Sequence, residues 1–570
     1  MLCTRIASVT RRDLAWAREV LIAAGQLEQG VHDALVPDAH HAVDERVAYM
    51  HALTRASGRV FYALFSGEVL RAEDHLRRLQ ALARAAPTLN GVVGHVRIPE
   101  GFAYYGVFPE QYCEAAHAWS IEHQADPAPA VLVVGVRSIG TTLAAVVAAA
   151  LEAAGFTVRS FTVRPVGPPF ARELTLAPAA VAGDAHALVV DEGPGLSGSS
   201  MAAVAQALWR AGMQPEQVSF LPSHAGEPGP EASAQVREVW QRTRSYVFAP
   251  SAPIFCGTTL AQALARGITE LGLGEVRHVA EPGSGEWPST SMPPEALATC
   301  RPFARPKFYV TTDCGDLLLT FYGLASVEGK SLAACAVEVL RQRYLNEFGP
   351  PPLGCVDGFV AVPWVHGTCA SPSAAGRVWD DTLARYLVRT RGPVLRRSAR
   401  AASLERLSNI VAVNAERELG LDCSDWFAAT RLLHDLPAAY WAASTDGELG
   451  PAYWLHTDGG RWCKLGSPVR SHDPTAPGVQ PILWDVAGAI ADWPLSRQDA
   501  ATLLCTLEHE LGVRVPEPAI DVYLGAFLAY RVGWHQVCGL AANDGGECAA
   551  HEAAAAACRS RLKQTLVRLH

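Results

Sequence analysis

The chain has 570 residues, of which 49% are hydrophobic and 18% are charged, with a formal net charge of −9. A single core stops growing near roughly 250 to 300 residues, so this length predicts two to four domains. The acidic balance, with a pI of about 6.1, argues against a protein that binds nucleic acids by neutralising phosphates. We therefore expect a globular protein without a nucleic-acid partner.

The start of the chain brings Arg5, Arg11 and Arg12 before any long apolar stretch, which argues against a secretory signal. The longest apolar region, 131–156, contains Arg137 and Glu152 and is more typical of a strand, turn and helix than of a membrane span. The 14 cysteines are scattered without a dense framework, as is usual for reduced thiols. These features predict a cytoplasmic protein with no membrane partner.

The first 125 residues predict a helical region, because residues 13–27 and 44–82 carry apolar side chains at helical spacing. An aromatic-rich stretch follows at 101–112, just before the first expected core strand. Such aromatic side chains can stack a base, although packing within a core is their commoner use.

Two apolar runs that each lead through a small-residue turn into a helix carry the most informative pattern. The first, 131–136, is followed by a turn with Gly135, Arg137, Ser138 and Gly140. The second, 187–190, stops at two carboxylates and continues through a serine-rich turn, with Asp191, Glu192, Ser197, Gly198, Ser199 and Ser200. Ligands bind beyond the carboxyl ends of parallel strands, and the free N–H groups of a following helix suit a phosphate. The pattern therefore predicts a site for a phosphate-bearing small molecule.

These two segments, in this order, resemble the type I phosphoribosyltransferases. The resemblance implies an α/β domain with a parallel sheet and an enzyme that transfers ribose 5-phosphate between phosphoribosyl pyrophosphate (PRPP) and a nitrogenous acceptor. It implies Mg²⁺ as the cofactor, carried by PRPP, with Asp191 as the candidate ligand from the protein and no other metal ligand. It is also compatible with a homodimer.

The same resemblance implies roles for the residues of both turns. Asp191 and Glu192 would hold the ribose and act in catalysis, with Arg164 as the cation of a closing loop. Residues Ser197 to Ser200 would bind the 5-phosphate, and the pyrophosphate would contact Gly135, Arg137, Ser138 and Gly140. The alternative is a generic strand-to-helix turn, in which Ser197 or Ser199 only caps the helix.

Two departures from the family pattern keep a second function open. Four residues, 193–196, separate the acidic pair from Ser197, where the family usually has three, and serine stands at 197 and 200 where the family has threonine. The alternative is a regulatory protein that binds PRPP or a nucleotide without turnover.

A Pro/Gly/Ser-rich stretch begins near residue 281 and predicts a linker over 281–304. Beyond it, two strand-like runs around 307–320, a helix over 331–348 and a strand at 358–363 faintly resemble the small lobe of aminoglycoside-phosphotransferase-like kinases. The segments 454–466 and 482–488, the latter with Asp485, resemble that family's active-site region and its later structural aspartate.

The expected kinase chemistry is incomplete, because Thr320 stands where a kinase places the lysine that binds phosphates and no metal-binding aspartate follows residue 464. We therefore predict a degenerate, pseudokinase-like domain over 305–570, with a plain helical accessory domain as the alternative. The fold prediction is α/β overall: a helical hood at 1–125, a phosphoribosyltransferase-like domain at 126–280, the linker, and a largely helical α+β domain.

Overall fold

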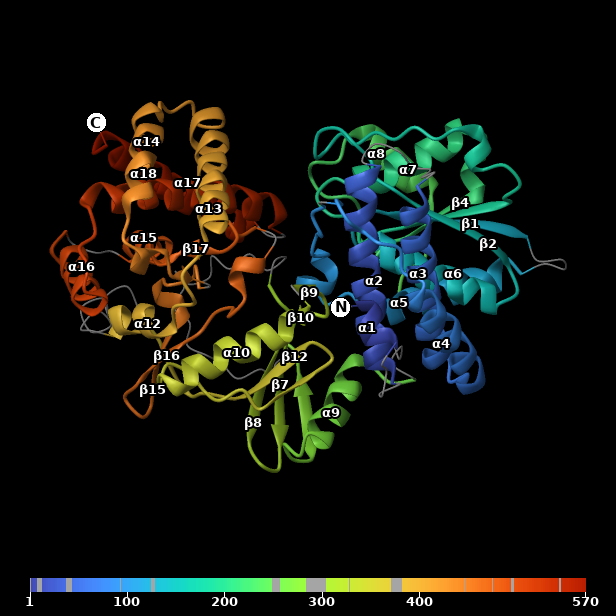
Figure 1. The fold of residues 1–570 in the computed structure, drawn as a ribbon, viewed down its shortest axis with the longest axis horizontal. Coiled ribbons are helices and arrows are strands. Elements are labelled where there is room, and N and C mark those ends of the chain that lie inside the picture. Colours follow the sequence, from blue (N-terminus) through green and yellow to red (C-terminus); the bar gives the residue numbers. More distant parts are fainter. Residues whose placement is uncertain are drawn as a thin grey trace. The chain divides into compact units, whose positions relative to one another are not determined.

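The computed structural model describes residues 2–7, 13–36, 44–92, 94–124, 129–248, 257–282, 304–327, 329–370, 382–444, 446–473, 475–493, 497–542 and 545–569. The predicted linker at 281–304 lies almost entirely outside these residues. The chain forms two compact units (Figure 1). Unit 1 comprises residues 1–272 and 323–332, and unit 2 comprises residues 273–322 and 333–570.

Unit 1 begins with helices that pack around a shared apolar core. They are α1 (Leu2–Ala7), α2 (Leu14–Leu35), α3 (Glu45–Phe65) and α4 (Val69–Arg84), followed after the short η1 (Gly101–Tyr105) by α5 (Pro109–Glu122). Two of them begin at an aspartate cap: the Asp13 carboxylate accepts from the Trp16 N–H, and that of Asp44 from the Arg46 N–H. Such caps satisfy N–H groups that the first helical turn leaves without a partner.

The centre of unit 1 is a five-stranded parallel sheet with the order β2-β1-β3-β4-β5. Its strands are β1 (Ala130–Val136), β2 (Thr157–Val163), β3 (His186–Val190), β4 (Val218–Leu221) and β5 (Arg244–Ser245). The helices between and after them are α6 (Ile139–Ala153), α7 (Ser199–Arg210), α8 (Ala234–Arg242) and α9 (Leu260–Glu270). The predicted α/β class is confirmed, since β1 and β3 are buried apolar strands that pair side by side.

Unit 2 contains a five-stranded antiparallel sheet with the order β11-β12-β8-β7-β6. Its strands are β6 (Val276–Ala280), β7 (Lys307–Thr312), β8 (Asp316–Phe321), β11 (Gly354–Val356) and β12 (Phe359–Pro363). Helix α10 (Leu332–Leu345) packs on one face of this sheet through Ala333, Ala336 and Leu340.

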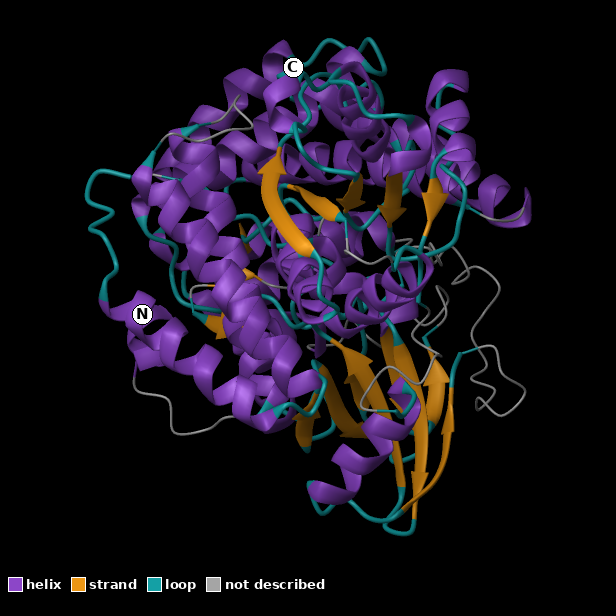
Figure 2. Ribbon diagram, turned by 90° about the vertical axis from the view of Figure 1, so that its right-hand side faces the viewer, coloured by secondary structure: helices purple, strands orange, loops and turns teal. Residues whose placement is uncertain are grey.

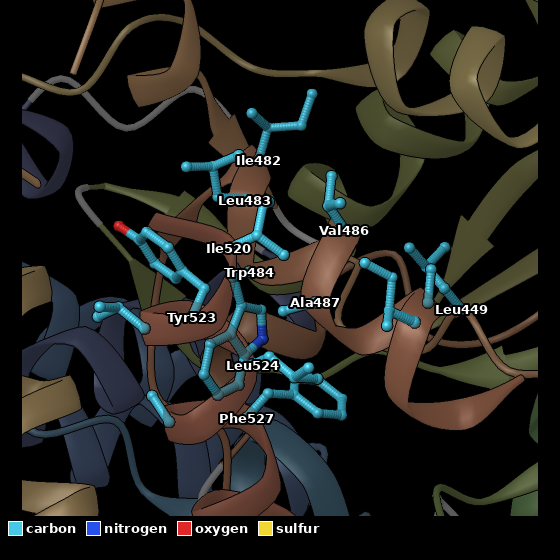
Figure 3. Close-up of a cluster of buried hydrophobic side chains, with 14 of the residues drawn as sticks. Leu449, Ile482, Leu483, Trp484, Val486, Ala487, Ile520, Tyr523, Leu524 and Phe527 are labelled. Carbon is cyan, nitrogen blue, oxygen red and sulfur yellow. The ribbon is translucent and has the colours of Figure 1, made fainter. Parts of the chain in front are cut away.

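The rest of unit 2 is mainly helical. Figure 2 distinguishes the helices, strands and loops of the whole described chain. Its helices are α12 (Thr382–Thr390), α13 (Arg397–Val411), α14 (Ser424–Ala429), α15 (Ile482–Asp492), α16 (Arg497–Leu511), α17 (Glu517–Ala541) and α18 (Gly545–Val567). Figure 3 shows the core where Trp484 and Val486 of α15 lie near Tyr523 and Phe527 of α17. Five short strands form two small sheets, β13-β15-β16 and β14-β17. They are β13 (Gly367–Cys369), β14 (Ala443–Ser444), β15 (Trp454–Thr457), β16 (Trp462–Lys464) and β17 (Gln480–Pro481).

Within the described part of the chain, none of the helices combines the length and the apolar character that crossing a membrane requires.

Candidate functional site

The carboxyl ends of β1 and β3 lie side by side in unit 1, because Gly135 pairs with Val190. A Cβ atom on Gly135 would lie 2.3 Å from the Gly140 carbonyl oxygen, and one on Gly140 would lie 2.4 Å from that of Val190. Close packing of the turn against β3 therefore explains both glycines without a ligand. Ser138 in the same turn has φ +128°, a region that costs a residue with a side chain of order 1–3 kcal/mol.

The two acidic residues predicted at the end of β3 are held by neighbouring groups, Glu192 through its carboxylate and Asp191 through its backbone. The Gly101 N–H donates to Glu192 Oε2 at 2.9 Å, and the Tyr112 hydroxyl donates to the Asp191 carbonyl oxygen at 2.8 Å. Burial raises the pKa of Asp191 to about 7, and burial with the nearby Glu100 raises the pKa of Glu192 to about 8. Near neutral pH the pair therefore carries much less than two negative charges.

The two arginines predicted to face pyrophosphate and the closing loop both bind Asp33 of helix α2. Arg137 Nη1 donates to Asp33 Oδ1 at 2.9 Å, and Arg164 Nε donates to the same oxygen at 2.8 Å. The structure thus brings Arg137 and Arg164 together on a shared protein carboxylate. No local sequence pattern singles out Asp33, because it lies more than 100 residues before either arginine.

The predicted phosphate loop at Ser197–Ser200 makes internal hydrogen bonds. Ser197 Oγ donates to Ser199 Oγ at 3.0 Å, and the Ser199 N–H donates to Ser197 Oγ at 3.3 Å. Ser199 Oγ in turn reaches the Pro169 carbonyl oxygen at 3.2 Å, and Gly198 has φ +63°. The hydroxyls thus bond within the turn and to Pro169, whereas the N-cap residue of α7, Gly198, has no side chain that could cap the helix.

A second candidate site lies in unit 2 around the buried carboxylate of Asp446. Its Oδ2 accepts from the Tyr386 hydroxyl and, at 3.1 Å, from Arg343 Nη2. Its Oδ1 accepts from the Glu448 N–H at 3.1 Å and lies 2.9 Å from Lys464 Nζ. A carboxylate offers about four acceptor positions, so these donors occupy all of them.

Asp485 of α15 holds the backbone beside Asp446. Its Oδ1 accepts from the Gly447 N–H at 2.8 Å, which is the structural kind of role the sequence suggested for this aspartate. Burial, with the charge of Asp446, raises the pKa of Asp485 to about 8. Both carboxylates and Arg470 line a cavity of about 20 Å³, which is space for about one water molecule.

An ion-pair chain extends the Asp446 site toward the sheet. Glu448 Oε1 lies 3.5 Å from Arg470 Nε, and Arg470 Nη1 lies 3.0 Å from Asp473 Oδ2. Asp473 also pairs with Arg305, which lies two residues before the start of β7. We call the eight residues described so far the polar cluster of unit 2: Arg305, Arg343, Asp446, Glu448, Lys464, Arg470, Asp473 and Asp485.

A lysine lies directly across the strand pair from Thr320. Lys307 of β7 is the register partner of Thr320 of β8, so the two side chains project from the same face of the sheet. Val360 of β12 also pairs with Thr320, and it packs with α10 and with Val469, the neighbour of Arg470. This face of the sheet therefore points toward the polar cluster.

The segment at 454–466 that the sequence favoured as an active-site region forms the hairpin β15–β16. His456 on this hairpin is exposed and makes an edge-on ring contact with Trp462, whereas Lys464 belongs to the polar cluster. Sequence reasoning missed Asp446 and Lys307, because the contacts that single them out join segments distant in the chain.

The carboxylates of unit 2 do not fit a magnesium site. Among the residues with described positions, no group of three or more His, Cys, Asp or Glu side chains is arranged to hold a metal ion. Both oxygens of Asp446 already accept from protein donors, and the raised pKa of Asp485 makes it a poor anionic ligand near neutral pH.

Comparisons with known proteins gave matches among solved structures alone: no protein family and no curated protein matches the chain. A choline kinase from Streptococcus pneumoniae is 13% identical, with a TM-score of 0.36, 54% of this chain covered and 98% of that one. A macrolide 2'-phosphotransferase from Brachybacterium faecium is 17% identical, with a TM-score of 0.31 and coverage of 52% and 97%. A choline/ethanolamine kinase family protein from Mesorhizobium loti is 15% identical, with a TM-score of 0.30 and coverage of 46% and 89%.

These comparisons correct the expected function. The prediction of a PRPP-dependent phosphoribosyltransferase, with a PRPP-binding regulator as its alternative, is wrong, because the solved structures that part of the chain resembles are small-molecule kinases. In unit 1, protein groups already bind the side chains that the motif assigns to phosphate and pyrophosphate. Its arginines already share Asp33, and its serines already bond one another.

Proposed function

We propose that unit 2 is a phosphotransferase of the small-molecule kinase type, which binds the phosphates of a nucleotide and passes the terminal phosphoryl group to a hydroxyl of a small molecule. The observation that carries this proposal is the placement of Lys307. It stands across the strand pair from Thr320, on the sheet face that points toward the polar cluster.

Lys307 is suited to bind a phosphate. Its side chain is exposed, and among the residues that the structure describes it forms no ion pair. Although the residue as a whole is exposed, the protein around its ammonium group lowers its pKa by excluding water. Arg305 lowers the pKa further, and Glu448 opposes both effects. A phosphate oxygen would supply the charged acceptor that this ammonium group lacks, and such charge-assisted hydrogen bonds are about twice as strong as neutral ones.

The polar cluster supplies the remaining charges that phosphoryl transfer needs. Catalysis of this reaction consists mainly of positioning and of stabilising negative charge on the transferred group. Lys464 lies beside Asp446, so one side chain can bind the phosphoryl oxygens while the other accepts a proton. Arg470, at the cavity wall, adds a second cation.

Transfer in this arrangement requires the site to open, because its cavity has space for about one water molecule and Lys464 is buried. It also requires one exchange of partners. At rest, the four donors leave Asp446 no acceptor position for a substrate hydroxyl. When Lys464 turns to the phosphoryl group, Oδ1 is released and accepts the proton of the attacking hydroxyl. The bond from phosphorus to the acceptor oxygen forms as the bond to the nucleotide's bridging oxygen breaks. This requirement predicts slow ATP hydrolysis in the absence of an acceptor.

Isothermal titration of the full-length chain with ADP tests the binding step. We expect measurable binding that weakens at least tenfold in Lys307→Met, because a hydrogen bond to a charged group contributes roughly 1.5–3 kcal/mol. Lys563→Met, which removes an exposed lysine from α18, is the matched control and is expected to bind as the wild type does. Absence of ADP binding by the wild type would overturn the proposal.

A further inference from the structure

Three side chains from separate elements of unit 1 form a line of hydrogen bonds. Glu28 Oε1 of α2 lies 2.9 Å from His51 Nδ1 of α3, and His51 Nε2 lies 3.0 Å from Ser160 Oγ of β2. Arg55, one turn after His51 on α3, donates from Nη1 to Ser160 Oγ at 3.0 Å. A hydroxyl, an imidazole and a carboxylate in this order are the arrangement that activates a serine as a nucleophile.

The groups that can only donate or only accept show which atoms of this line carry the protons. Arginine has no acceptor, so Ser160 Oγ must accept from Arg55. An ionised Glu28 can only accept, so His51 Nδ1 carries a hydrogen, and in the neutral ring Nε2 is left as the acceptor. The Ser160 O–H therefore donates to His51 Nε2. This is the tautomer in which the histidine can take the serine proton.

Burial increases from the hydroxyl to the carboxylate. Ser160 and His51 are half-buried, and Glu28 is buried, with its Oε2 left without a hydrogen-bond partner among the described residues. Arg55 is also buried and is held by an ion pair with Glu152. Ser160 and His51 thus keep part of their surface exposed to solvent, while the groups that orient them, Glu28 and Arg55, are held by α2 and α3, which pack together.

We propose that unit 1 carries an esterase-type site in which Ser160 attacks small, activated esters. Ser160 Oγ bonds to the carbonyl carbon and its proton passes to His51 Nε2. The carbonyl oxygen becomes an oxyanion beside the Arg55 guanidinium. Collapse of this intermediate breaks the bond to the leaving alcohol, which takes the proton from His51. Water then attacks the acyl-serine, gives a proton to His51 and releases the acid, and the proton returns to Ser160.

Arg55 and Glu28 have distinct parts in this site. Arg55 lies against the reacting oxygen, so it acts on the transition state directly. Among the described residues the Glu28 carboxylate hydrogen-bonds His51, so Glu28 is a positioning residue that fixes the ring and its tautomer. The site uses residues of unit 1 alone and is independent of the nucleotide chemistry proposed for unit 2.

Covalent labelling of the full-length chain with a fluorophosphonate probe tests this proposal. We expect the intact mass to increase by one probe unit, with the adduct on the peptide that contains Ser160. Labelling should be lost in Ser160→Ala and should slow at least a hundredfold in His51→Gln, which removes the base. The matched control, Ser66→Ala, alters an exposed serine whose hydroxyl bonds only the Ala63 carbonyl oxygen, and it should label as the wild type does.

Two outcomes would overturn the proposal. One is an unlabelled wild-type protein whose circular dichroism shows it to be folded. The other is labelling that persists in Ser160→Ala or is unchanged in His51→Gln. Glu28→Gln separates positioning from packing: it keeps the size of the side chain, and we expect slower labelling with an unchanged melting temperature.

Discussion

Asp446 shows how a buried carboxylate is paired with cations and hydrogen-bonded in this protein. Arg343 and Lys464 provide two cations, while the Tyr386 hydroxyl and the Glu448 N–H complete its hydrogen bonds. Removing one partner of a buried ion pair destabilises the fold by more than the intact pair stabilises it. The remaining charge is then left unpaired in a region of low dielectric.

Lys464→Met should therefore destabilise unit 2 by roughly 3 kcal/mol, in the range for breaking one buried ion pair. Equilibrium denaturation in urea, followed by tryptophan fluorescence, measures this change. In the double variant Asp446→Asn with Lys464→Met, the loss should be smaller than the sum of the two single losses. Additive losses would show that Asp446 and Lys464 do not interact as the geometry indicates.

Close packing against the Val190 carbonyl oxygen explains why residue 140 is a glycine. Gly140→Ala places a Cβ atom 2.4 Å from the Val190 carbonyl oxygen, so a backbone shift is required. We expect a loss of about 1–3 kcal/mol from overpacking, seen as a lower melting temperature. Gly545→Ala, whose Cβ would meet nothing within 4 Å, is the control. Equal stability of the two variants would contradict this account of the turn.

At the scale of elements, the two carboxyl groups at the end of β3 make the stability of the protein depend on pH. The pKa values of Asp191 and Glu192 are raised by burial to about 7 and about 8 in the folded state. The folded chain thus binds more protons than the unfolded chain between pH ~4 and ~8, and the free energy of unfolding should fall as the pH rises through this window. Thermal unfolding in a series of buffers measures the slope.

The double variant Asp191→Asn with Glu192→Gln removes both titrations, so its stability should depend less on pH over the same window. The comparison with the wild type is needed because the pKa of Asp485 in unit 2 is raised as well and contributes a slope of the same sign. Parallel curves for the two proteins would show that the acidic pair does not titrate in this range.

The parallel sheet of unit 1 was predictable because buried strands leave a local signal. The apolar runs at 131–136 and 187–190 are β1 and most of β3, and both end at the predicted turns. The side chains around those turns were not predictable in the same way. Asp33, which binds Arg137 and Arg164, reaches the sheet from α2, and no local pattern reveals such a contact.

Unit 2 shows the same division between local and distant information. The sequence correctly placed strands near 307–320 and identified Thr320 in β8. The expectation that the phosphate-binding lysine is missing came from the sequence of β8 alone, where Thr320 stands. Antiparallel register sets Lys307 beside Thr320, and register depends on the turn and on the packing of the whole sheet.

At the scale of the whole molecule, the chain passes between the two units more than once. Residues 323–332 belong to unit 1 but lie between two pieces of unit 2, and β6 precedes the residues once expected to begin the second domain. A fragment that begins at residue 305 would lack β6, an edge strand of the unit 2 sheet. The experiments proposed above therefore use the full-length chain.

The central claim is that Lys307 supplies the phosphate-binding cation of unit 2. Moving that lysine across the strand pair tests it most directly, since Lys307→Thr with Thr320→Lys keeps the composition and returns the ammonium group to the same face of the sheet. Isothermal titration with ADP should show binding that is weakened at least tenfold in Lys307→Thr and largely restored in the double variant. Wild-type affinity in Lys307→Thr, or a double variant that binds no better than Lys307→Thr, would contradict the account.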